Sequence, residues 1–87
     1  MQVMTFDRVV DLQEFINAKA HSSQMYLLIF RSELTSQPWC VAECSVYDVW
    51  SERKIHLRDL NRHTHWSDAL EFAYRYSDVR EDEMLYA

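Results

Sequence analysis

Glycine is absent from this 87-residue sequence, whereas an average protein contains roughly 7% of it. Loops that cradle phosphate groups need glycine so that the backbone can approach the ligand. A P-loop and a dinucleotide-binding fingerprint are therefore excluded, and we expect no cofactor. Tight turns that need a positive φ angle must use Asn, Asp or Ser instead.

Long hydrophobic runs and a secretory signal are also missing. The longest apolar run, Met25 to Phe30, is far shorter than the ~18 residues of a membrane span. No charged segment followed by an apolar one stands at the N-terminus. We therefore predict no membrane association, a cytoplasmic location, and reduced thiols at Cys40 and Cys44.

What the sequence does contain is enough apolar material for a small core. Hydrophobic residues make up 48% of the chain and aromatic residues 14%, which argues against disorder. The length corresponds to a single domain. We predict a globular α+β domain over residues 1–80 and a short acidic C-terminal tail over residues 81–87.

The first half of the chain predicts a short strand in residues 1–6, a helix and a second strand. Asp7 could cap the helix, with Val9, Leu12 and Ile16 as its apolar face; a later start at Asp11, with a capping box, is the alternative. The segment from Gln24 to Glu33 predicts the second strand; its apolar run, Met25 to Phe30, has no polar interruption, which is typical of a central strand covered on both faces.

Residues 39–50 fit two structures, because apolar residues share one face whether the segment is a strand or a helix started by Pro38. The valines, tryptophans and tyrosine of the segment favour a strand. The next segment, residues 53–60, alternates. This alternation places Ile55 and Leu57 inward, with Lys54, His56 and Arg58 on the outer face.

The last helix has the clearest pattern. Thr64 or Ser67 could cap it, and five residues recur at helical spacing after the cap: Trp66, Ala69, Leu70, Ala73 and Tyr76. Tyr74 should face away from them. The predicted fold is α+β, in the order β-α-β-β-β-α: a mostly antiparallel sheet of three to four strands, packed by two helices.

Cysteines and histidines raise two chemical hypotheses. A zinc site would join Cys40 and Cys44 to His63 and His65. On a strand, however, the two cysteines would lie about 13 Å apart, too far to share one ion. A ribonuclease-like site would use His56, His63 and His65 as acid and base, with Lys54 or Arg58 stabilising the phosphorane. Because no catalytic set is complete, we predict that the protein is not an enzyme.

The segment from Arg53 to His65 is the one basic region in a chain with a formal net charge of -5. A patch of five residues, Arg53, Lys54, His56, Arg58 and Arg62, could contact phosphates. Cations on an outer strand also protect an exposed sheet edge from aggregation. Binding to nucleic acid by a regulator is therefore our alternative function.

Acidic and aromatic residues gather at the opposite end of the sequence. We expect the tryptophans to lie in the core, but not all five tyrosines, and tyrosine is enriched at protein interfaces. The candidate partner-binding residues are Glu71, Tyr74, Asp78, Glu81, Asp82, Glu83 and Tyr86.

These observations predict a small protein-binding module, an inhibitor or regulator that occludes a basic surface of a protein target, such as a nucleic-acid-processing complex. A homodimer is compatible with this role. In size and composition the chain resembles the compact acidic inhibitors that phages and mobile elements use against host defence, anti-CRISPR proteins among them. The resemblance concerns size and composition only, because no sequence motif is shared.

Overall fold

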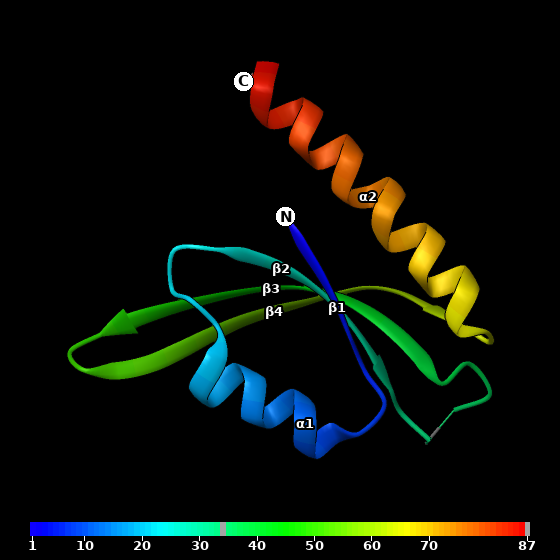
Figure 1. Ribbon diagram of the computed structural model, residues 1–87, viewed down its shortest axis with the longest axis horizontal. Coiled ribbons are helices and arrows are strands. Elements are labelled where there is room, and N and C mark those ends of the chain that lie inside the picture. The colour runs from blue at the N-terminus through cyan, green and yellow to red at the C-terminus, as the bar shows by residue number, and fades with distance from the viewer. Residues whose placement is uncertain (34, 87) are drawn as a thin grey trace.

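The computed structural model describes residues 1–33 and 35–86, and the side chains up to Arg80. Its elements follow the predicted order (Figure 1): β1 (Gln2–Phe6), α1 (Val9–Glu14), the π-helical turn η1 (Phe15–Lys19), β2 (Met25–Arg31), β3 (Trp39–Val49), β4 (Glu52–His63) and α2 (Trp66–Tyr86). The α+β fold class is confirmed.

The four strands form one mixed sheet in the order β1-β2-β3-β4. β1 is parallel to β2, and the other two pairs are antiparallel. Parallel neighbours need a crossover connection, which α1 and η1 provide. Within β4, Leu60 is an extra residue, since Val41 pairs with Asn61 and Ala42 with Asp59.

β2 is the central strand, as its uninterrupted apolar sequence predicted. Leu27, Leu28 and Ile29 are completely buried, and alternate residues of β2 belong to two separate cores. One core contains Leu28 with Leu12 and Phe15 of the first helix and turn. The other contains Leu27 and Ile29 with Ala69 and Ala73 of α2. The two helices therefore cover opposite faces of the sheet.

The ambiguous segment 39–50 is a strand, not a helix. β3 pairs with β2 on one side and with β4 on the other, so its backbone groups are satisfied within the sheet. Cys40, Ala42, Cys44 and Val46 are buried. By their register with β2, these four face the side of the sheet that carries α1.

Both predicted starts of the first helix are wrong. The N-cap residue is Arg8, and no side chain caps the helix, so neither Asp7 nor Asp11 has that role. Asp11 lies within the first turn, where its carboxylate contacts Arg8 Nε at 3.3 Å and complements the helix dipole. Val9, predicted to be on the apolar face, is exposed.

The last helix confirms the predicted apolar face, with Ala69 and Ala73 fully buried. It begins at Trp66, so Ser67 lies inside the helix and is not its cap. The separation of a domain over 1–80 from an acidic tail over 81–87 stays a prediction, because it depends on side chains outside the described residues.

Candidate protein-binding surface

Small residues set α2 close to the sheet. Ala69, Ala73 and Ser77 follow one another at intervals of four, and all three are buried. Two polar contacts to β1 fix the helix rotation: Trp66 Nε1 donates to Thr5 Oγ1 at 3.3 Å, and Ser77 Oγ donates to the Met1 carbonyl oxygen at 3.4 Å. Together these contacts determine which residues of α2 face outward.

The outward face of α2 carries the described part of the predicted binding set. Glu71, Tyr74 and Asp78 are spaced at i, i+3 and i+7, and all are exposed, so they form one stripe along the helix. We call these three residues the α2 stripe. The Tyr74 side chain is 54% exposed. Val79 is also exposed, at 56%, but it points about 140° away from Tyr74 around the helix. Arg75 Nη2 contacts Glu71 Oε1 at 2.6 Å.

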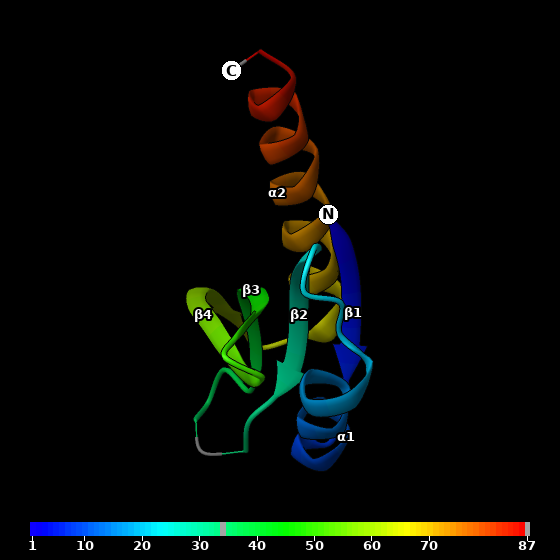
Figure 2. The ribbon, with the colours of Figure 1, turned by 90° about the vertical axis from the view of Figure 1, so that its left-hand side faces the viewer.

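Net charge is concentrated on this helix. The sequence of α2 holds six acidic residues and two arginines, a formal charge of -4, whereas the whole chain has -5. Four candidate residues of the last turns, Glu81, Asp82, Glu83 and Tyr86, have side chains outside the described residues. The ribbon of α2 extends well past the sheet (Figure 2), so the acidic sequence is carried away from the body of the domain.

The basic segment is divided between the two faces of β4. Lys54, His56 and Arg58 lie opposite Tyr47, Ser45 and Glu43, on one face as predicted. Arg53 and Arg62 lie opposite Asp48 and Cys40, on the other face. The five residues therefore do not form one patch.

Acidic residues of the same chain also stand beside the cations of β4. Lys54 Nζ lies 3.1 Å from Glu52 Oε2, and Arg58 Nε lies 3.9 Å from Glu43 Oε2. Arg53 Nη1 donates to the Ile16 carbonyl oxygen at 2.8 Å, which connects the β3–β4 hairpin to the first turn of η1. Arg53 therefore has a structural contact as well as a charge.

Glu43 is a buried carboxylate that sequence reasoning did not single out. Its residue is only 5% exposed, on the α2 face of β3. Tyr76 donates its hydroxyl to Glu43 Oε2 at 3.0 Å, and Arg80 Nε lies 3.4 Å from Oε1. Burial, and then the hydrogen bond to Glu43, raise the pKa of Tyr76. The available signal was an acid whose sequence neighbours in the first half of β3, Cys40 to Ala42 and Cys44, are all apolar.

Trp50 contradicts the prediction that the tryptophans belong to the core. It occupies the two-residue turn between β3 and β4 and is 94% exposed, while Trp66 is also exposed. Trp50 and Ser51 have φ angles of 53° and 65°, which defines a type I′ turn. Trp50 is exposed because the turn lies at the tip of a long hairpin, where no helix of the described residues packs over it.

Ile55 and Leu57 are less buried than the alternation of β4 predicted. They face the same side of the sheet as Cys44 and Val46, yet they remain 42% and 45% exposed. α1 packs mainly on β1 and β2, which leaves these two side chains of the outer strand half exposed. The result is an uncovered apolar edge.

The residues of the zinc and ribonuclease hypotheses are not brought together. Cys40 and Cys44 share a strand face about 13 Å apart, while His63 pairs with Trp39 on the opposite face. His56 and His63 are seven residues apart on one strand, roughly 23 Å. The His63 ring packs on Phe72, with centroids 5.5 Å apart. Among the described residues, no group of three or more His, Cys, Asp or Glu could hold a metal ion.

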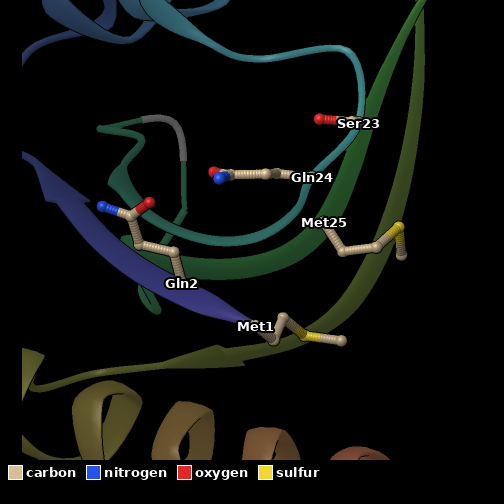
Figure 3. Close-up of a pocket in the computed structure, with 5 residues that line it drawn as sticks. All are labelled: Met1, Gln2, Ser23, Gln24 and Met25. Atoms are coloured by element: carbon tan, nitrogen blue, oxygen red, sulfur yellow. The ribbon is translucent and has the colours of Figure 1, made fainter. Parts of the chain in front are cut away.

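A shallow pocket lies beside the N-terminal end of β1. Figure 3 shows its lining side chains, which come from β1 and from the start of β2 and the turn before it: Met1, Gln2, Ser23, Gln24 and Met25. These side chains are uncharged and offer amide and hydroxyl groups alone. None of these side chains is a His, Asp, Glu or Lys that could activate Ser23 as a nucleophile.

Comparisons with known proteins add no family and no relative. No protein-family model matches the chain, and neither the curated proteins nor the solved structures contain a match. In the part of the chain that the structure describes, no helix is both long enough and apolar enough to cross a membrane.

Proposed function

We propose that this protein is a non-enzymatic protein-binding module that docks the α2 stripe on a basic surface of its target. The observation that carries the proposal is the exposed side chain of Tyr74, set between Glu71 and Asp78 on the helix that holds a formal charge of -4. Exposed tyrosines are enriched where proteins meet.

Charge and apolar contact have separate roles in this mechanism. The acids of α2 attract a positively charged surface over a distance of about 8–10 Å at physiological salt and orient the approach. Tyr74 then supplies the desolvated contact at the centre of the α2 stripe, where binding energy is usually concentrated. The bound helix occludes the target surface and so inhibits or regulates the target.

Nucleic-acid binding by the basic segment is not favoured by the geometry. Its cations lie on both faces of β4, and Lys54, Arg58 and Arg53 contact groups of the same chain. A phosphate backbone would have to compete with these contacts. The wider role as an anti-defence protein rests on size and composition and stays a prediction.

The test is a quantitative affinity capture from cells that naturally express the protein, with three baits. The first bait is the wild type, and the second carries Glu71→Lys, Tyr74→Ala and Asp78→Lys. The third carries Asp7→Lys and Glu33→Lys, which change the net charge equally at exposed sites outside the α2 stripe. Circular dichroism confirms that all three are folded.

The proposal expects a protein that the wild type and the Asp7/Glu33 control capture, that the stripe variant loses at least tenfold, and that salt elutes. Equal capture by the stripe variant would contradict it. Oligonucleotide binding at low salt that is lost when Arg53, Lys54 and Arg58 become Glu would support the alternative instead.

A further inference from the structure

β4 is a long strand whose outer edge has no neighbouring strand among the described residues. β4 spans 12 residues, pairs with β3 on one side, and is the last strand of the sheet. Residues 52–59 are all exposed. Strands typically have about five or six residues, and an exposed edge offers unpaired N–H and C=O groups as a template for another strand.

The turn at Trp50 and Ser51 determines which residues offer those groups. Val49 and Glu52 flank this two-residue turn, and such a flanking pair is hydrogen-bonded. Pairs then alternate along the ladder, and the extra residue, Leu60, comes only after residue 59. The backbone groups that point away from β3 are therefore those of Arg53, Ile55, Leu57 and Asp59.

The side chains of these four residues form a self-complementary sequence. They share the sheet face of Cys44 and Val46, in the order cation, apolar, apolar, anion. When two such strands pair antiparallel about a two-fold axis through His56, Arg53 lies opposite Asp59 of the second copy and Ile55 lies opposite Leu57. Each of these pairs occurs twice. The exposed apolar residues cover one another, and opposite charges meet at both ends.

Neighbouring registers lack this complementarity. Moving the axis to Ile55 would set Arg53 opposite Leu57, and moving it to Leu57 would set Ile55 opposite Asp59. On the other face the chosen register places Lys54 near Arg58 of the second copy. Each of these cations has an acid of its own chain beside it, Glu52 at 3.1 Å and Glu43 at 3.9 Å, which reduces their repulsion.

We propose that β4 pairs with β4 of a second copy of this chain, which joins two four-stranded sheets into one continuous sheet of eight strands. The pairing forms through the backbone groups of residues 53–59, with Arg53–Asp59 ion pairs at both ends. The proposal does not rest on the α2 stripe, whose residues lie on a different element and remain exposed in the dimer.

Sedimentation equilibrium of the full chain tests the proposal with two charge reversals. The wild type is expected to show a concentration-dependent monomer–dimer equilibrium. Arg53→Asp alone and Asp59→Arg alone each create two like-charged pairs and should weaken the dimer at least ~10-fold. Mixed in equal amounts, the two variants restore opposite charges at both ends of the interface and should form a heterodimer.

Two further variants are controls for misfolding and for general effects of net charge. Arg53→Asp removes the contact to Ile16, so Leu57→Lys, at a half-exposed position without that contact, provides an independent loss of dimer. Asp7→Arg should leave the wild-type equilibrium unchanged. A wild type that stays monomeric up to ~500 µM would overturn the proposal. So would single variants that dimerise like the wild type, or a mixture that forms no heterodimer.

Discussion

The turn between β3 and β4 should be stabilised by replacing Trp50-Ser51 with Asn-Gly. Both residues have positive φ angles, 53° and 65°. A non-glycine residue in the left-handed region costs roughly 1–2 kcal/mol, and Asn-Gly is the preferred pair for a type I′ turn. Trp50 is 94% exposed, so removal of its ring sacrifices almost no buried area.

The expected gain follows from these terms. Full relief at the two positions would amount to about 2–4 kcal/mol, from which the extra freedom of glycine in the unfolded chain subtracts ~0.5–1 kcal/mol. Because Asn keeps part of the cost at position 50, the net stabilisation should be about 1–2 kcal/mol. In a domain of this size each kcal/mol raises the melting temperature by about 4–8 °C.

Urea denaturation followed by far-UV circular dichroism is the suitable assay, because the substitution removes a fluorophore. Trp50→Ala is the matched control: it removes the exposed ring but leaves a non-glycine residue with positive φ, so its midpoint should stay close to that of the wild type. A double variant that is no more stable than the wild type would refute the reasoning. That result would mean that the tryptophan ring makes a stabilising contact.

Three further predictions concern the buried polar groups and the thiols. Tyr76→Phe removes the donor to buried Glu43 and should lower the free energy of unfolding by about 1.5–3 kcal/mol, whereas Tyr74→Phe, on the exposed face, should have little effect in the same urea titration. Burial raises the pKa of Cys44 above 9.0, and burial with the Glu43 hydrogen bond raises that of Tyr76 above 10.0. Because the folded chain holds these protons more tightly, the stability that these two groups contribute should be fully present below about pH 8 and fall as pH rises through both pKa values; a urea midpoint that stays flat from pH 8 to pH 11 would contradict this. Arg53→Ala removes the contact to the Ile16 carbonyl oxygen and should cost about 1 kcal/mol, while Lys54→Ala, next to it on the outer face, should cost less in the same measurement.

The sequence by itself determined the elements whose side-chain pattern is strong. The uninterrupted apolar run of β2 predicted a strand buried on both faces, and the spacing of Ala69 and Ala73 predicted both the buried side of α2 and the outward direction of Tyr74. The β-branched and aromatic residues of β3 correctly favoured a strand. These features depend on residues near one another in the chain, where periodicity fixes direction.

Tertiary structure alone decided which of these faces are covered. Alternation placed Ile55 and Leu57 on the inner face of β4, but their exposure depends on how far α1 reaches across the sheet. Trp50 is exposed because the chain turns there and not one residue later, and Glu43 is tolerated in the interior because α2 brings Tyr76 and Arg80 to it. Whether a side chain is buried depends on which helix packs over its face of the sheet. The local sequence pattern does not show where that helix lies.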